Sequence, residues 1–528
     1  ATTSVFLVLT FRPEFVPLWT GRSHVTSLML SRLGRTPVEA MVAQVTGGKT
    51  LPPEVQQQIL AKTDGVPLFV EELTTMVLES GLLREGPDHY ELSGPLPPLA
   101  IPETLHDSLV ARLDRLGAAR EVAQLAATLG REFSYELMSA VAPMAKERLH
   151  QALAKLVEAE VLYPCGIDGQ ASYLFKHALI QEAAYQSLLK SRRQQYHQQI
   201  AQVLETQGAN SATTQPELVA HHYTEAGLIA RALPYWQQAG QAALQRSANQ
   251  EAIGHLSKAL ALLQTLPETE ALRQVELALR VTLGVSLMTT KGYAAPEVEL
   301  TFARARTLCQ TMGDTPQFFP ALSGLFAFYL VSGDCATARH FAEQCLHLAE
   351  AAQDAALMIE AHRILANVLL FSGEVTTALT HAEHALALYD KQQHRTLAFV
   401  FGQDPAVVCL SFVAWGLQLL GYSDRAAQRS QEAVTWAQEL GHANSLGFAL
   451  TFAARFRANL GDWEGIRTRA EAAIALASEQ GLIFWEAMGT IYRGWALSGL
   501  GQSEEGLALM RRGLAAYGAT GAMIARAG

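Results

Sequence analysis

The chain has 528 residues, of which 49% are apolar and 17% charged, a balance that predicts a well-packed protein of several domains and excludes a disordered one. Its net charge of -10 argues against a broad surface for nucleic acid or acidic lipid. The five cysteines lack C-x-x-C spacing, which argues against a zinc site or a disulfide framework. No apolar run is long enough to span a membrane. We therefore expect a cytoplasmic protein without a membrane partner.

The first predicted element is a short strand in the run VFLVLT, residues 5–10. Its nearly continuous apolar character is typical of a strand that is covered on both faces within a parallel sheet. No comparable strands follow it. We therefore expect its neighbours to lie upstream, in a domain of which this chain holds only the end.

The run TGGKT, residues 46–50, resembles the end of a phosphate-binding loop. A complete loop needs a glycine where Ala43 stands, and its Thr begins a helix. Pro52 and Pro53 prevent a helix from starting at Thr50. Because the runs on both sides have helical spacing, we interpret the motif as an ordinary loop between two helices.

The next part of the chain predicts a helical lid and then a winged-helix-like domain. Residues 68–83 read as an amphipathic helix, and a Pro/Gly-rich stretch at 94–105 marks a domain boundary. Three helices at 121–130, 134–141 and 146–162 are followed by a strand hairpin at 161–166 and 171–176. Because the third helix carries balanced charges, we interpret the domain as structural and expect no nucleic-acid contact.

The remainder predicts helical repeats. Glycines recur at separations of 40, 48, 40 and 40 residues: Gly333, Gly373, Gly421, Gly461 and Gly501. Mostly small residues stand five and twelve positions after each glycine and seven before it, which lets two antiparallel helices approach closely. These offsets are those of the tetratricopeptide helix pair, although the period is longer. We predict a tetratricopeptide-like solenoid that begins near residue 216.

Few side chains in the chain suggest chemistry. His381 and His384 have helical metal-site spacing, but no third ligand is near them in the sequence, so we interpret them as part of a solvated face. The adjacent residues His221 and His222 point in two directions from a helix, so they are no better as candidate metal ligands. The insertion at 394–407 could hold a ligand loop, although Asp404-Pro405 favours an ordinary helix start. No catalytic constellation can be placed.

Several segments together carry a family resemblance: LVLTFRPEF, TDGVPLFVEELTTMVLESGLL, YLFKHALIQEAAYQSLL, RSANQEAIGHLSKALALL, TKGYAAPEV and GQDPAVVCLSFVAWGLQLLGY. The chain resembles bacterial ATPases of the STAND signal-transduction class, in particular those with an N-terminal class III adenylate/guanylate cyclase domain and C-terminal tetratricopeptide repeats. The resemblance implies a mainly α chain with three parts. Residues 1–100 would be a remnant of an α/β P-loop ATPase domain with its lid, 101–205 the winged-helix-like domain, and 206–528 the repeats.

The resemblance also implies a partial nucleotide site. Arg12 matches the sensor arginine of such ATPases, with Thr10 beside it at the strand end. Gly65 and Pro67 match the G-x-P turn of the lid. His177 matches a winged-helix histidine that contacts bound ADP, although the Asp that usually follows it is Ala178 here. Each of these residues also has a purely structural interpretation.

The resemblance implies a regulatory module whose repeats bind a protein or small-molecule effector and control an output domain outside this chain. The alternatives are a fragment of a STAND-type transcriptional regulator and a stand-alone repeat scaffold. Alone, the chain should neither hydrolyse ATP nor make cyclic nucleotides, since it lacks the P-loop and the metal-binding acids. We expect no cofactor here, ATP or ADP with Mg²⁺ in the intact protein, and leave oligomerisation on activation open.

Overall fold

The computed structural model describes residues 8–11, 15, 25–93, 104–166, 171–209, 215–312 and 317–524. The chain divides into two compact units, residues 1–192 and 193–528, which we describe separately. The described residues are mainly helical, as predicted. Among them we find no helix with the length and apolarity that crossing a membrane requires.

The first unit combines helices with short strands. Its described elements are α1 (Arg35–Val45), α2 (Pro53–Thr63), α3 (Pro67–Glu79), β1 (Leu83–Glu85), β2 (Tyr90–Leu92), α4 (Leu105–Arg115), α5 (Ala119–Leu129), β3 (Glu132–Ser134), α6 (Tyr135–Val141), α7 (Lys146–Glu158), β4 (Leu162–Cys165), β5 (Ser172–Phe175) and α8 (Ala178–Gln186). Helix α9 (Lys190–Ala209) continues into the second unit.

The predicted N-terminal strand is wrong for its described part. Val8, Leu9 and Thr10 have no regular structure and are exposed, while residues 5–7 lie outside the described residues. A single strand without neighbours cannot pair its backbone groups, which accounts for the difference.

The interpretation of TGGKT as an inter-helix loop is confirmed. It connects α1 to α2, and Gly47 and Gly48 take the left-handed backbone conformation. The Lys49 ammonium donates to the Glu85 carboxylate at 2.5 Å and to the Gly86 carbonyl at 3.1 Å.

The run 68–83 is shorter as a helix than its amphipathic pattern predicts. Helix α3 ends at Glu79, and Leu83 begins strand β1, which pairs antiparallel with β2. A positive φ at Gly81 turns the chain between the two elements. The α3 side chains Val70 and Leu73 pack with Ile59 of α2 in the core of this part.

The three predicted helices and the hairpin after them are confirmed as α5, α6, α7 and the antiparallel pair β4–β5. A third strand, β3, was not predicted. It pairs with β5, so the sheet order is β3-β5-β4. Phe133 is the buried side chain of β3 and stacks on Tyr173 of β5. The assignment of this arrangement to a winged helix remains a prediction.

The second unit is helical throughout its described residues. After α9 come α10 (Pro216–Glu225), α11 (Ile229–Gln245), α12 (Asn249–Leu263), α13 (Glu270–Lys291), α14 (Pro296–Met312), α15 (Phe318–Val331), α16 (Cys335–Ala352), α17 (Ala355–Phe371), α18 (Val375–Leu388), α19 (Leu397–Phe401), α20 (Pro405–Leu419), α21 (Ser423–Leu440), α22 (Ala443–Ala458), α23 (Trp463–Gln480), α24 (Ile483–Gly499) and α25 (Ser503–Ala519).

The predicted repeat register is confirmed. Each glycine of the repeat lies in the turn between two paired helices, from α15–α16 to α24–α25, with φ between +68° and +92°. Glycine adopts this backbone region without strain. The small residues five positions later are buried where the helices meet, for example Ala338 and Ala426.

The close approach of α24 and α25 at Gly494 can be tested by substitution. A Cβ on Gly494 of α24 would lie 2.6 Å from the Gly506 carbonyl oxygen of α25. Gly494→Ala should therefore lower the free energy of unfolding by about 1–3 kcal/mol in urea titrations, through overpacking. The control is Gly254→Ala in α12, where nothing lies within 4 Å. That change should stabilise the protein by about 0.5–1 kcal/mol. Equal effects of the two changes would contradict the close packing.

The 394–407 insertion serves as a helix start and also adds a short helix. The Asp404 carboxylate accepts a hydrogen bond from the Val407 amide at 2.9 Å, and Pro405 occupies the first turn of α20, as predicted. The extra helix, α19, packs against α13 and α15 on the inner side of the repeats.

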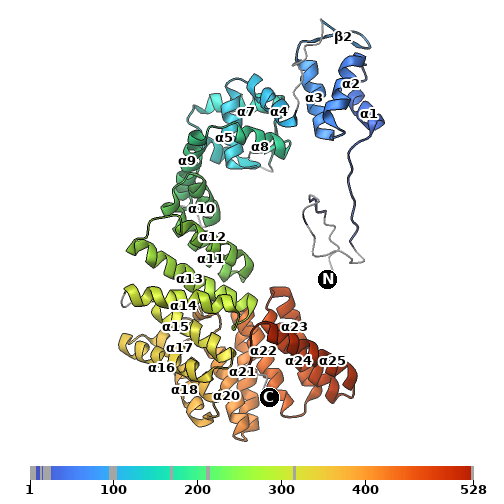
Figure 1. The fold of residues 1–528 in the computed structure, drawn as a ribbon. Helices are drawn as coiled ribbons and strands as arrows, with labels where there is room; N and C mark the ends of the chain where they lie inside the picture. The colour runs from blue at the N-terminus through green and yellow to red at the C-terminus, as the bar shows by residue number, and fades with distance from the viewer. Residues whose placement is uncertain are drawn as a thin grey trace. The chain divides into compact units, whose positions relative to one another are not determined.

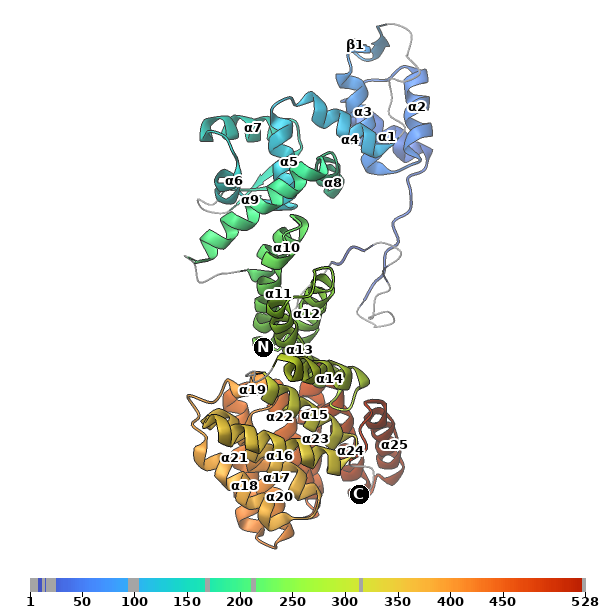
Figure 2. The ribbon, with the colours of Figure 1, turned by 60° about the vertical axis from the view of Figure 1, so that its left-hand side comes forward.

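The repeats curve until helices near the C-terminus meet α13. Helix α24 packs against α13, and the views in Figures 1 and 2 show the red C-terminal helices beside the yellow-green α13. The residues after α25 complete the contact. The amides of Met523 and Ile524 donate to the Val331 carbonyl at 2.8 and 3.2 Å, and Gly521 packs on the Ala294 backbone. The solenoid therefore surrounds its own inner face.

Candidate functional site: an aromatic pocket inside the repeats

The helices on the inner side of the repeats are apolar around most of their circumference. Helix α15 reads FFPALSGLFAFYLV, and α20 reads PAVVCLSFVAWGLQL. A helix in an open solenoid has one apolar face and one solvated face. A helix that is apolar around its whole circumference is instead buried on both faces. The inner faces of these helices accordingly point at one another across an enclosed space.

That space contains a partly open cavity, which we call the aromatic pocket; the centres of water molecules can occupy about 100 Å³ of it. Its walls come from α13, α14, α15, α17, α19, α20, α22, α24 and α25. The aromatic side chains that line it are Tyr293, Phe302, Phe326, Phe371, Phe401, Phe412, Phe448, Phe452, Phe484, Trp485, Tyr492 and Tyr517. Small-molecule sites are typically concave and apolar in this way, with a few polar groups that fix orientation.

A buried ion pair forms one polar part of the wall. The Arg363 guanidinium donates to both oxygens of Glu360, at 2.6 Å each, and the Ser323 hydroxyl donates to Glu360 Oε1 at 2.9 Å. These partners satisfy Glu360 and compensate the charge of Arg363. The desolvation of the pair is therefore matched by well-formed hydrogen bonds.

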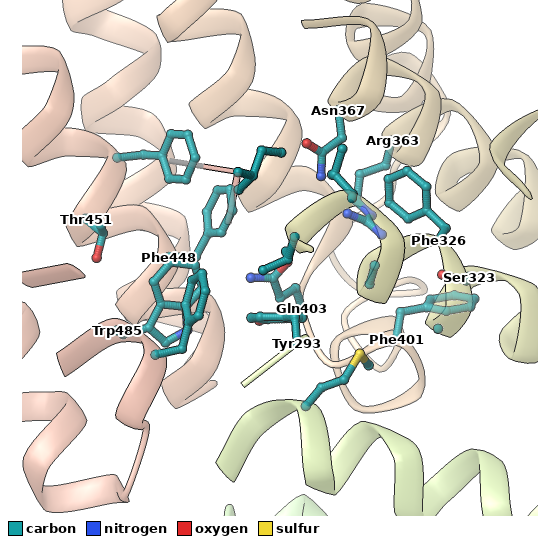
Figure 3. A pocket seen from close by; sticks show the side chains of 18 of the residues that line it. Tyr293, Ser323, Phe326, Arg363, Asn367, Phe401, Gln403, Phe448, Thr451 and Trp485 are labelled. Atoms are coloured by element: carbon teal, nitrogen blue, oxygen red, sulfur yellow. The ribbon is translucent and has the colours of Figure 1, made fainter. Parts of the chain in front are cut away.

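Asn367 and Gln403 bring amide groups to the pocket. Asn367 lies one helical turn after Arg363 on α17, and its buried Oδ1 has no hydrogen-bond partner. Figure 3 shows Arg363 and Asn367 on one side, Phe448 and Trp485 on the opposite side, and Gln403 between them. A buried acceptor without a partner costs free energy, which a ligand with an N–H or O–H donor would recover.

A second arginine, Arg455 of α22, lies in the same wall. Its guanidinium carbon stands 3.8 Å from the ring centroid of Trp415, a cation–π geometry. Burial raises the pKa of Tyr492, and the nearby Arg455 charge partly offsets the rise. Among the described residues Arg455 has no ion-pair partner.

One asparagine joins distant parts of the curved repeats, in a group that we call the Asn444 junction. Asn444 Nδ2 donates to the Tyr293 hydroxyl at 3.0 Å and to the Gly402 carbonyl at 2.6 Å. Asn444 Oδ1 accepts from Trp485 Nε1 at 2.5 Å. The junction connects the segment after α13, the α19–α20 loop, α22 and α24. It fixes the positions of two pocket aromatics, Tyr293 and Trp485.

The nucleotide site that the family resemblance implies remains a prediction. Thr10 is exposed in an irregular segment, and Arg12 lies outside the described residues. Gly65 and Pro67 form the turn into α3. A Cβ at Gly65 would lie 2.1 Å from the Leu33 carbonyl oxygen, and φ there is +70°, so this glycine has a packing role.

His177 precedes α8 and lies near the ion pairs that connect α3 to later elements. Lys176 Nζ donates to the Glu71 carboxylate of α3 at 2.8 Å, and Arg112 binds Glu72. Burial lowers the pKa of His177, and its Nε2 is buried without a partner. Nucleotide contact by His177 remains a prediction.

His381 and His384, which we interpret from the sequence as part of a solvated face, have a third histidine close to them. His362 Nδ1 lies 2.8 Å from His381 Nδ1, and the His362 ring centroid is 5.4 Å from that of His384. Helix α17 thus brings a third imidazole close to the pair, from 19 residues before His381 in the sequence. Nevertheless, no group of three His, Cys, Asp or Glu side chains in the described part of the chain is arranged to hold a metal ion.

Buried neutral histidines predict acid sensitivity of the second unit. Burial lowers the pKa of His442 to about 4, and burial with neighbouring His197 and His221 lowers that of His222 to about 3, from 6.5. Unfolded histidines take up protons near pH 6.5, so stability should fall as pH drops from 6.5 toward 4. The slope is at most about 1.4 kcal/mol per pH unit for each histidine.

Urea titrations between pH 7.5 and 5 measure this slope. His222→Gln should make it shallower, whereas the same change at His347, whose side chain is exposed, should leave it unaltered. An unchanged slope in His222→Gln would contradict the prediction.

Comparison with known proteins gives one curated relative. The chain is 25% identical over 520 residues to "Uncharacterized protein R02095" of Rhizobium meliloti (strain 1021), covering 96% of this chain. The chain spans about half the length of that relative, 50%. No known protein-family profile matches the chain.

Several solved structures are similar in part. The NprR–NprX peptide complex aligns with 72% of this chain and 96% of its own, at 12% identity and a TM-score of 0.44. A Rap protein complexed with Competence and Sporulation Factor covers 56% and 78%, at 13% identity and a TM-score of 0.42. The STAND protein PH0952 from Pyrococcus horikoshii, which has a tetratricopeptide repeat sensor, covers 94% and 74%, at 12% identity and a TM-score of 0.36.

Proposed function

We propose that this chain is the regulatory part of a signalling protein, and that its repeats form a sensor whose effector binds in the aromatic pocket. The observation that carries the proposal is the pocket itself. Twelve aromatic side chains from helices far apart in sequence face one cavity with a few polar groups. A repeat array that served only as a scaffold would need no such interior.

The Asn444 junction supports a sensing role. It binds two pocket aromatics that are far apart in the sequence, Tyr293 and Trp485, so a ligand in the pocket contacts the elements whose separation sets the curvature. A ligand shifts such an equilibrium only by its differential affinity for the closed form. In our proposal the difference in affinity arises because the pocket walls come together only when α24 packs on α13. Effector binding would favour the closed repeats.

The output lies outside this chain in our proposal. The intact protein would bind ATP or ADP with Mg²⁺ and regulate an adenylate/guanylate cyclase domain, as the family resemblance implies. The length of the Rhizobium meliloti relative, twice that of the matched region, leaves room for such domains. The chain alone should show no magnesium-dependent ATP turnover above a buffer control, and measurable turnover would contradict this assignment.

A cavity-filling variant tests the sensor. Ala327 of α15 lines the pocket and is half-buried, so Ala327→Trp should occupy the ligand's space. The control is Ala387→Trp on the exposed face of α18. A library of apolar metabolites is screened by thermal shift. A ligand at 100 times its Kd should stabilise the wild type and the control by about 2.7 kcal/mol, and the filled variant not at all. Hits that stabilise all three proteins equally, or no hits, would overturn the proposal.

A further inference from the structure

The charge of the aromatic pocket differs from that of the chain. The chain carries a net charge of -10, yet the described residues that line the pocket include two arginines and no Asp or Glu. Acidic side chains are thus absent from the described lining of this pocket. The two arginines differ in whether a carboxylate already compensates their charge.

Arg363 has little. Glu360 binds its Nε and Nη2 at 2.6 Å, and the two side chains are 6% and 0% exposed. A guanidinium that is already paired in a bidentate geometry gains little Coulomb energy from a second anion. Arg363 is therefore a hydrogen-bond donor to the pocket and not its anion site.

Arg455 differs in this respect. It has no carboxylate partner among the described residues, and its face is occupied by the Trp415 ring at 3.8 Å. Cation–π contact lowers the energy of the cation but does not neutralise it. Arg455 also hydrogen-bonds the Tyr492 hydroxyl, and the N–H donors that remain on its edge can bind a carboxylate. Stacking on Trp415 also holds the plane in place before a ligand arrives.

We propose that the effector is a small organic anion, with a carboxylate or sulfonate that binds Arg455 and a planar apolar body that packs among Phe448, Phe452 and Trp485. The inference rests on the proposed function and specifies its ligand class. The anion supplies the missing counter-charge, and the aromatic walls supply the burial. A neutral molecule of the same shape would offer Arg455 no counter-charge.

Two matched probes test this class, 2-naphthoate and 2-naphthalenemethanol, which share a ring system and differ in charge. Their dissociation constants are measured by isothermal titration calorimetry on the full chain. Because hydrogen bonds to charged groups contribute about 1.5–3 kcal/mol, the carboxylate should bind about tenfold to hundredfold more tightly than the alcohol. The preference should shrink at high salt.

Substitutions test whether Arg455 causes the preference for 2-naphthoate over 2-naphthalenemethanol. Arg455→Gln should abolish the preference for 2-naphthoate over the alcohol, whereas Arg455→Lys should keep part of that preference. The control is Arg425→Gln, which removes an equal charge from an exposed arginine near the Tyr422 ring. It should keep the full preference. A circular-dichroism melt of each variant confirms that it is folded.

The outcomes separate the two proposals. Equal binding of both probes, or a preference that survives Arg455→Gln, would overturn the anion inference and leave the sensor intact. A preference lost equally in Arg425→Gln would also overturn it, since net charge would then be the cause. If neither probe binds while thermal-shift hits depend on Ala327, the inference fails alone. If no such hits exist either, both proposals fail.

Discussion

Replacing Asn444 with alanine should lower the free energy of unfolding of the repeats by about 3 kcal/mol or more. The change leaves the Gly402 carbonyl, the Tyr293 hydroxyl and Trp485 Nε1 without their partner, and each buried group left unsatisfied costs about 1–3 kcal/mol. Urea titration followed by circular dichroism at 222 nm measures the loss. The pocket should widen as well, so probe affinity should fall in the variant.

The matched control is Asn459→Ala. Asn459 ends α22 and donates one hydrogen bond, to Gln418 Oε1 at 2.8 Å, in an exposed position. Water replaces that bond, so the cost should stay below about 0.5 kcal/mol. If Asn444→Ala behaved like Asn459→Ala, the junction would not hold distant parts of the repeats together.

Glu360→Gln should also cost about 3–5 kcal/mol, because it leaves the Arg363 charge buried without compensation. The same measurement on Glu374→Gln provides the control. That change removes an exposed pair with Arg339, in which both side chains are more than 40% exposed, and should cost less than about 1 kcal/mol.

A double variant separates the two components of the Glu360 effect. Replacing Glu360 and Arg363 together with methionine removes both charges and should recover most of the loss, since buried ion pairs are often no more stabilising than apolar residues of similar size. If the double variant were as unstable as Glu360→Gln, lost packing and not the uncompensated charge would be the cause.

The sequence predicted the repeats well because local rules determine them. The turns at Gly333 and its counterparts need a positive φ, and the small residues at fixed offsets mark where paired helices touch. Both signals lie within one helix pair, so they can be seen without knowing the curvature. The Asp404 cap was visible for the same reason, since its partner, the Val407 amide, is three residues away.

The pocket could not be predicted in this way. Phe302, Phe401 and Trp485 line the same cavity, yet nothing local relates their positions, which depend on the summed rotation of every pair between them. Two hints were present. The α15 and α20 sequences are too apolar for helices with one solvent-exposed face. The insertion that breaks the repeat period also supplies Phe401 and Gln403 to the pocket wall.

Other misses were equally non-local. Strand β3 is three residues long, with a single buried side chain, Phe133, and is recognisable only through its pairing with β5. His362 lies 19 residues before His381 along the chain, and only the packing of α17 on α18 brings their rings together. Neither feature has a sequence pattern of its own.

The return of α24 onto α13 also bears on how the molecule folds. In an open repeat array every contact is between neighbours, so such arrays can nucleate anywhere and fray from their ends. Here Tyr293 and Asn444, 151 residues apart, share a hydrogen bond, which places a long-range closure on top of the local pairings. Closing so large a loop costs entropy late in folding. We therefore expect the repeats after α13 to fold and unfold as one cooperative block with a slow final step, without progressive fraying from the C-terminal pair.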